Sequence, residues 1–206
     1  MHKVLDFIKK NKQFSFFLLL VILLALITIF APVIAPQDPY ASDLKNALQP
    51  PSSAHWFGTD KLGRDIFSRV IYASRSSLPA TLILVVLIFA IGTLLGTLAG
   101  YFGGWIDAVI MRISDMMISF PGMVLAIAVA GIMGASVKNA VIAVAVVSWP
   151  KYARLARSLV MKIRHEDYIY AAIVTGSKTS YILRKYMLPN VIPTLVITAA
   201  TDIGGM

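Results

Sequence analysis

Residues 164–193 read RHEDYIYAAIVTGSKTSYILRKYMLPNVIP and form a long polar and basic interval between two apolar stretches. Good helix formers run from Ile163 to Val174, and Gly176 is placed to stop that helix. Ser177 can cap a second helix, which is expected to end at Leu188-Pro189. The pattern therefore predicts two short helices with a break, in a basic loop at a membrane face, where they form a docking surface.

The composition is that of an integral membrane protein. Of 206 residues, 58% are hydrophobic and only 14% are charged, and the mean hydropathy is +0.77. The net charge of +9 does not indicate nucleic-acid binding, because the basic residues lie between long apolar runs without interleaved aromatic residues. The chain has no cysteine, so it forms no disulfide and uses no thiolate chemistry.

The N-terminal region predicts a first membrane span. Residues 1–13 are rich in lysine, and residues 14–36 are uncharged and long enough to cross a hydrocarbon core of roughly 30 Å. A cleaved signal peptide is the weaker alternative, because the apolar run exceeds the usual length of about 7 to 15 residues. We expect an uncleaved anchor with a cytoplasmic N-terminus.

Residues 37–75 predict an external loop with a short amphipathic helix that begins near Ile66 and enters the next span. Prolines interrupt regular structure in this loop, and its acidic and basic residues nearly balance. His55, Asp60 and Asp65 suggest a catalytic or metal cluster, but their spacing matches no common ligand pattern. A folded surface turn is the stronger interpretation.

The second span is expected within residues 76–106, and glycines at successive i+4 positions give it one face for close helix packing. These glycines are Gly92, Gly96 and Gly100. A Gly103-Gly104 pair then breaks the helix. A third span is expected over residues 116–133, weakened early by Pro121-Gly122.

Charged residues flank the third and fourth spans. Asp107, Arg112 and Asp115 predict an interfacial charge group at the inner face, with a proton relay as the alternative. The fourth span is expected from about Lys138 to Ala156, and it includes basic side chains that snorkel inward. These are Lys151 and Arg154.

The loop that follows is expected in the cytoplasm, because its basic residues greatly outnumber its acidic ones and four spans precede it. A fifth span is expected from Val191 to Met206. Asp202, with Gly204 and Met206, is a candidate for the translocation path, because an aspartate within a span needs a partner or water. We expect that the chain is truncated in this span.

One motif resembles a known family. Tyr170-Ala171-Ala172, three residues, Gly176, nine residues and then Tyr186-Met187-Leu188-Pro189 resemble the E-A-A-x3-G-x9-I-x-L-P loop of the membrane subunits of binding-protein-dependent ABC importers. The spacing is kept, but Tyr170 replaces the glutamate of the motif and Tyr186 replaces its isoleucine. The resemblance implies that the loop at residues 157–189 couples to an ATPase.

The external loop resembles that of the dipeptide, oligopeptide and nickel permeases, and the second, or C-type, subunit in particular. The residues of this resemblance are His55, Trp56, Gly58, Thr59, Asp60, Gly63, Arg64 and Asp65. It implies an all-α polytopic membrane protein with the type I permease fold of ABC importers, with residues 76–206 as the permease core and five spans present of an expected six.

The resemblance also implies partners. The chain lacks a G-x-x-x-x-G-K-[ST] phosphate loop, so ATP and Mg²⁺ are expected on two separate ABC ATPase subunits, and no cofactor is expected in this chain. The other expected partners are a second homologous permease subunit, an extracytoplasmic substrate-binding protein and the lipid of a bacterial or archaeal cytoplasmic membrane.

The substrate stays open between di- or oligopeptides and nickel or a nickel chelate. Two rival functions come from other classes. One is an ion-coupled secondary transporter that uses Asp107, Asp115 and Asp202 as relays, and the other is a membrane-embedded hydrolase that uses His55, Asp60 and Asp65.

Overall fold

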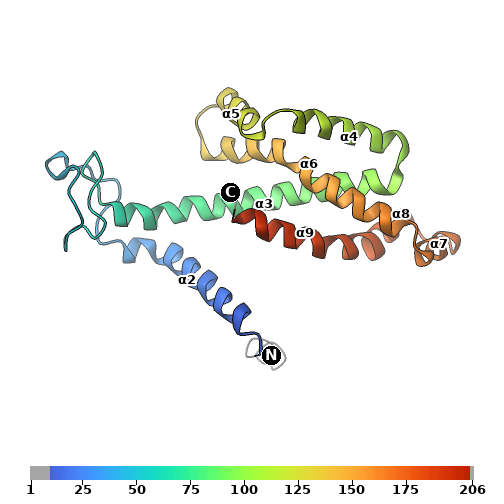
Figure 1. Ribbon diagram of the computed structural model, residues 1–206, viewed down its shortest axis with the longest axis horizontal. Helices are drawn as coiled ribbons and strands as arrows, with labels where there is room; N and C mark the ends of the chain where they lie inside the picture. Colours follow the sequence, from blue (N-terminus) through green and yellow to red (C-terminus); the bar gives the residue numbers. More distant parts are fainter. Residues whose placement is uncertain (1–9, 205–206) are drawn as a thin grey trace. The chain divides into compact units, whose positions relative to one another are not determined.

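The computed structural model describes residues 10–204 and consists of helices and turns with one long irregular loop (Figure 1). In chain order the elements are α2 (Lys12–Ile34), η1 (Leu44–Asn46), α3 (Ile66–Phe102), α4 (Gly104–Ser119), α5 (Gly122–Met133), α6 (Val137–Arg164), α7 (Asp167–Val174), α8 (Thr179–Ile182), η2 (Leu183–Met187) and α9 (Leu188–Ile203). The predicted all-α fold is confirmed. Of the predicted cytoplasmic N-terminus at residues 1–13, residues 1–9 lie outside the described residues, as does Met206.

The chain divides into two compact units, Met1–Pro79 and Ala80–Met206, which are described separately. In the first unit, α2 agrees with the predicted first span to within two residues at each end. Its length of 23 residues corresponds to about 35 Å of helix, enough to cross a bilayer core. The helix ends at Ala35, which is extended because the next residue is a proline.

The first unit continues through the predicted external loop to the start of α3. The expected short amphipathic helix is not a separate element, because α3 begins at Ile66 and continues without interruption for 37 residues. Pro79 lies inside α3. The amphipathic residues are therefore the first turns of the second predicted span.

Among residues 10–204, α2 and α3 are long and apolar enough to span a membrane, and the bent pair of α4 and α5 is a third candidate. Helix α6 has 28 residues but contains several basic side chains, and α9 has 16 residues. The fourth and fifth crossings therefore stay predictions.

The predicted third span over residues 116–133 is wrong as a single helix. Helices α4 and α5 meet at an angle of 94°. Phe120 is extended because it precedes Pro121, whose ring disfavours helical geometry in the residue before it. The proline therefore separates two helices where only a weakened one was expected.

In the second unit, the glycine face of α3 packs directly on α6, which confirms the predicted close helix packing. A Cβ atom added to Gly92 would lie 2.4 Å from the Cβ atom of Tyr152, and one added to Gly96 would lie 2.2 Å from the carbonyl oxygen of Ala153. One added to Gly100 would lie 2.9 Å from the carbonyl oxygen of Arg157. The two backbones are therefore too close for any side chain at these positions.

Helix α6 is the central element of this unit, with α4, α5 and α9 packed along it (Figure 1). It continues past the predicted end at Ala156 to Arg164, with Pro150 buried inside it. Its buried side chains join those of α3, α7, α8 and α9 in one core. The largest of them include Tyr152, Ile88, Val160, Ile169, Ile182, Met187, Val191 and Leu195.

We predict that Gly96→Ala lowers the stability of the folded protein by about 1–3 kcal/mol, because its methyl group overlaps the backbone of α6. The measurement is the apparent melting temperature of the purified protein in detergent. Gly131→Ala is the matched control, since a Cβ atom there meets nothing within 4 Å. Equal melting temperatures for the two variants would contradict the close packing.

Candidate functional site

The segment between α6 and α9 contains the predicted ATPase-coupling loop, and its helices begin and end differently from the prediction. The first short helix was expected to begin at Ile163, but α6 includes this residue and ends at Arg164. The chain then breaks at His165, and α7 begins at Asp167 after an extended Glu166. The two short helices lie at the C-terminal end of α6 (Figure 1).

Gly176 stops α7 as predicted, by a Schellman motif. Its φ angle is +79°, in the left-handed region that favours glycine. The amide of Ser177 donates to the carbonyl of Ala172, and the amide of Gly176 donates to the carbonyl of Ile173, both at 3.0 Å. These two bonds satisfy carbonyls at the end of α7 and set the direction of the chain toward α8.

The second short helix differs from the prediction in two ways. Its N-cap is Lys178 rather than Ser177, and no side chain caps it. It also does not end at Leu188-Pro189, because the π-helical turn η2 joins it to α9. Pro189 has no amide to donate and stands in the first turn of α9, where such a donor is not needed. The proline therefore begins a helix instead of ending one.

Helix α7 has one buried face and one exposed apolar face. Ile169 and Ala172 are buried in the core of the second unit. Tyr168, Tyr170, Ile173 and Val174 are exposed, and Val174 is 86% exposed. The hydroxyl of Tyr170 lies 3.1 Å from Nδ1 of His165. An apolar helix face held at one end of the unit fits a helix-in-groove contact with another protein.

The other predicted coupling residues lie around this face. Ala171 is exposed on α7, Leu188 is half-buried, and Pro189 is exposed at the start of α9. Tyr186 contacts the rings of Tyr168 and Tyr181, with centroids 5.9 and 6.0 Å apart. Their role in coupling stays a prediction.

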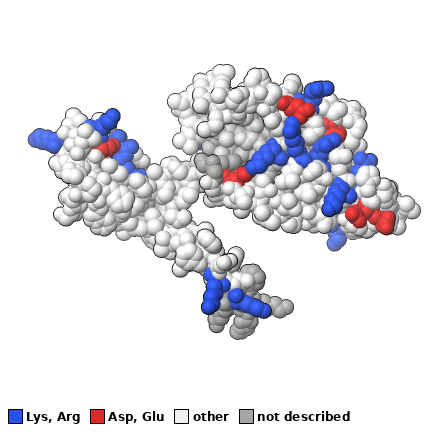
Figure 2. Space-filling view, viewed as in Figure 1, with Lys and Arg blue, Asp and Glu red and all other residues white. Residues whose placement is uncertain are grey.

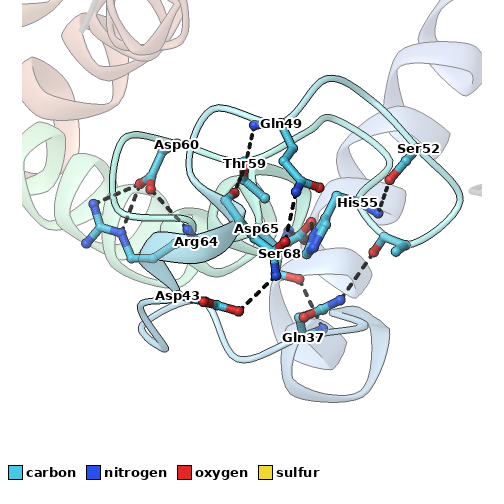
Figure 3. A network of polar contacts seen from close by, with 12 residues as sticks. Gln37, Asp43, Gln49, Ser52, His55, Thr59, Asp60, Arg64, Asp65 and Ser68 are labelled. Carbon is cyan, nitrogen blue, oxygen red and sulfur yellow. Dashed lines mark hydrogen bonds and ion pairs between the residues drawn. The ribbon is translucent and has the colours of Figure 1, made fainter.

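In the external loop, Asp60 organises a turn (Figure 3). One of its carboxylate oxygens accepts hydrogen bonds from the amides of Leu62 at 2.8 Å and Arg64 at 3.1 Å. The other pairs with the guanidinium groups of Arg64 and Arg69 at 2.8 and 2.7 Å. Desolvation raises the pKa of Asp60, but the bonds from Arg64 and Leu62 outweigh it and lower that pKa to about 2.

Asp65 joins the loop to α3. Its carboxylate accepts a hydrogen bond from the amide of Ser68 at 2.8 Å, and its carbonyl accepts the first helical bond, from Arg69, so Asp65 is the N-cap of α3. The other carboxylate oxygen lies 3.0 Å from Nδ1 of His55. Burial raises the pKa of Asp65, but the contacts with Ser68 and His55 outweigh it and lower that pKa. An aspartate directly before an apolar helical run was the sequence signal for this cap, and sequence reasoning missed it.

Thr59, Gly58 and Gly63 close the same loop. The hydroxyl of Thr59 donates to the carbonyl of Asn46 and accepts from the amide of Gln49 at 2.8 Å. Gly63 has a φ angle of +72°, and a Cβ atom there would lie 1.7 Å from the carbonyl oxygen of Asp43. These contacts require a hydroxyl side chain of the size of threonine at position 59 and a glycine at position 63.

The polar side chains of the loop therefore serve to hold its shape. His55 and Asp65 are engaged with each other, whereas Asp60 is occupied by two arginines. The ring of Trp56 lies beside that of Phe67, with centroids 4.8 Å apart, and Trp56 is 60% exposed. The polar side chains of the loop are therefore engaged with one another, and Trp56 offers an exposed aromatic ring at its surface.

Helix α6 presents a stripe of three basic side chains, each paired with an acid from a neighbouring helix. Arg157 forms a bidentate pair with Asp107 of α4, and Arg154 pairs with Asp115 of the same helix. Nζ of Lys151 lies 2.6 and 2.9 Å from the carboxylate oxygens of Asp202 on α9. Acidic and basic side chains gather on the visible face of the second unit (Figure 2).

Lys151 and Arg154, which were predicted to snorkel inward, each have an acidic partner within hydrogen-bond distance, and their direction relative to a membrane stays a prediction. Asp107 and Asp115 pair with α6, whereas Arg112 lines a surface groove with Trp105. The position of these three residues at the inner face also stays a prediction. The acids of α4 are used to hold α6.

Long apolar helices, with charged residues paired between helices, are typical of a multi-pass membrane protein. Residues 92–206 match the family described as binding-protein-dependent transport system inner membrane component. Residues 2–51 match the N-terminal TM domain of oligopeptide transport permease C. The chain belongs to the binding-protein-dependent transport system inner membrane component family and is an inner-membrane protein.

Several known proteins are similar to this chain. The "Probable D,D-dipeptide transport system permease protein DdpC" of Escherichia coli K12 is 45% identical over 90% of this chain and 62% of its own length. The dipeptide transport system permease protein DppC of Alkalihalophilus pseudofirmus is 42% identical over 96% of this chain and 65% of its own length. The nickel transport system permease protein NikC of Escherichia coli K12 is 38% identical over 92% of this chain and 68% of its own length. The chain thus spans less than two thirds of the length of the first two relatives.

We predict that acid opens the external loop. Because the pKa of Asp60 is lowered in the folded loop, its ion pairs stabilise the loop above the ordinary aspartate pKa, and this contribution is lost as the pH falls toward about 2. Pepsin cleavage between residues 35 and 65, measured relative to a synthetic peptide of the same sequence, should therefore rise steeply between pH 4 and pH 2.

The matched variants are compared at pH 4. Asp60→Asn loses both arginine pairs, and we expect its loop to be cleaved at least fivefold faster than that of the wild type. Asp38→Asn is the control, because Asp38 accepts one exposed backbone bond, from Tyr40, which an asparagine oxygen can also accept. Equal cleavage of the two variants would show that Asp60 does not hold the loop.

Proposed function

We propose that this chain is the C-type permease subunit of an ABC importer that moves di- or oligopeptides across the cytoplasmic membrane. The observation on which this rests is the exposed apolar face of α7, followed by the Gly176 turn, in the stretch that resembles the ATPase-coupling loop of ABC importers. Two of the similar proteins named above are dipeptide permeases, which favours peptides as the substrate.

In this proposal the energy comes from two ABC ATPases that hold ATP and Mg²⁺. Ile169 and Ala172 hold α7 on the core, so a push on its exposed face is transmitted to the spanning helices. Tyr170, half-exposed and bonded to His165, replaces the glutamate of the family motif. It contributes ring area rather than charge to the contact with the ATPase.

The external loop then meets a substrate-loaded binding protein, and a second homologous permease subunit completes the pathway. The internal bonds of Asp60 and Asp65 keep this loop in one shape, and the exposed ring of Trp56 offers a contact for the binding protein. The basic residues at the C-terminal end of α6 and in the helices that follow favour a cytoplasmic position for α7, and with it a cytoplasmic N-terminus. They are Arg157, Lys162, Arg164, Lys178, Arg184 and Lys185.

Nickel or a nickel chelate is the second candidate substrate, because the similar nickel permease covers most of this chain at 38% identity. An ion-coupled transporter is less well supported. Its supposed relays, Asp107, Asp115 and Asp202, are each engaged by a basic side chain rather than free to carry a proton. A hydrolase is also less well supported, since Asp65 caps α3 and Asp60 holds two arginines.

Reconstitution tests the proposed function. The full-length permease pair, the ATPases and the binding protein are placed in proteoliposomes, and uptake of radiolabelled dialanine is measured. We expect uptake that needs ATP and stops when the ATPase is inactive. Uptake driven by an ion gradient without ATP would refute the proposal, and ATP-driven uptake of a nickel chelate with none of dialanine would move it to the second substrate.

We predict that Gly176→Asp lowers ATP-driven uptake at least tenfold while the protein still inserts in the membrane. A Cβ atom at Gly176 meets nothing within 4 Å in this chain, so the added side chain clashes with no other part of the fold. The strain of an aspartate at a φ angle of +79° and the new charge both act at the turn that is proposed to meet the ATPase. Membrane abundance is measured alongside uptake and co-purification of the ATPase.

Gly104→Asp is the matched control. Gly104 also has a positive φ angle, of +55°, and a Cβ atom there also meets nothing within 4 Å, but this glycine lies at the start of α4. We expect near-normal uptake for this variant. Normal uptake in Gly176→Asp at normal abundance would remove the coupling role of the turn.

A further inference from the structure

The pair of Lys151 and Asp202 lies far from the coupling helices along both α6 and α9. At a rise of about 1.5 Å per residue, Lys151 is about 20 Å from either end of α6, and Asp202 is about 20 Å from the start of α9 at Leu188. Under the proposed function these helices cross the membrane, so the pair lies deep within a hydrocarbon core of roughly 30 Å.

The two side chains of this pair differ in exposure: Lys151 is accessible, whereas Asp202 is fixed by hydrogen bonds. The carboxylate of Asp202 accepts two bonds from Lys151 and one from the hydroxyl of Tyr152 at 3.0 Å, and its side chain is 18% exposed. The side chain of Lys151 is 60% exposed. Because Tyr152 is buried in the core, it positions the carboxylate, whereas the ammonium group stays accessible from outside the unit.

An accessible ammonium group at this depth does not suit a lipid-facing surface, because a charge among acyl chains is costly and within a membrane usually faces a partner or water. The opposite side of α6 cannot line an aqueous path, because Ala153 and Ala156 pack there on the glycine face of α3. Lys151, Arg154 and Arg157 are spaced three residues apart and continue the polar stripe along the helix. The stripe is therefore suited to an aqueous path.

We propose that Lys151 and Asp202, with Tyr152 as a positioning residue, form a contact site for the charged ends of a zwitterionic peptide within the translocation pathway. The ammonium group of Lys151 pairs with the peptide carboxylate, and the carboxylate of Asp202 pairs with the peptide amino group. The two charges neutralise each other when no cargo is present, and a bare metal cation would be repelled by Lys151. This proposal rests on the proposed function and deepens it.

Transport by the complete importer in proteoliposomes, with dialanine as the probe, tests the site. We expect Lys151→Met and Asp202→Asn each to lower uptake at least tenfold. Lys138→Met, a lysine at the start of the same helix, is the control and should keep normal uptake. Normal uptake in both site variants would overturn the proposal, whereas failure of the wild type to import dialanine would refute the proposed function instead.

A charge exchange separates binding from a purely structural ion pair. In the double variant Lys151→Asp with Asp202→Lys, opposite charges still join α6 and α9, so we expect the melting temperature to stay near that of the wild type. The peptide ends would meet the charges in reversed order, and we expect uptake to stay at least tenfold low. Full recovery of uptake would overturn the proposal, because it would show that only the clamp between the helices matters.

Access to the site is measured independently. The chain has no cysteine, so Lys151→Cys introduces one thiol that a membrane-impermeant methanethiosulfonate reagent can label. Labelling is measured by mass spectrometry as the increase in the mass of this chain. We expect labelling, because the proposal places position 151 on an aqueous path. Val86→Cys, an exposed apolar position near the middle of α3, should stay unlabelled. An unreactive Lys151→Cys would overturn the proposal.

Discussion

The contact between the backbones of α3 and α6 is the constraint on which the second unit depends. In a membrane the hydrophobic effect does not drive helices together, so close van der Waals packing has to do so. Gly92, Gly96 and Gly100 allow that packing because three successive positions on one face of α3 have no side chain. With α6 held in this way, its remaining faces can receive the other helices of the unit.

Three basic residues of α6 lie on faces of the helix that do not pack against α3, where they pair with acids of α4 and α9. Asp107 and Asp115 hold α4 to one part of the helix, and Asp202 ties α9 to its middle. Each pair compensates a charge that would be costly alone in a low-dielectric setting. The pairs also give the unit a polar face, which is the physical requirement for a pathway through it.

The coupling helices and this polar face belong to one connected structure. Helix α7 is anchored in the core by Ile169, and the helical backbone runs from α8 through η2 into α9 without an irregular segment. Asp202 lies near the far end of α9. Force applied at α7 can thus reach the Lys151–Asp202 pair along a helix, which links the proposed ATPase contact to the proposed peptide contact.

The sequence by itself determined the class of protein, the first span, the glycine face and the helix stop at Gly176, because each depends on local chemistry: apolar length, small residues at helical spacing, and a residue that adopts positive φ. It also led to the family through spaced motifs.

The sequence could not assign the roles of His55, Asp60 and Asp65, because the same residue types suit a catalytic cluster and a folded turn. Only the tertiary structure decided between them, by placing Asp65 at the cap of α3 and Asp60 between two arginines. The same holds for Pro121, Pro189 and the partners of Lys151: whether a proline bends, begins or ends a helix, and which acid meets a given base, depends on packing between segments far apart in the chain.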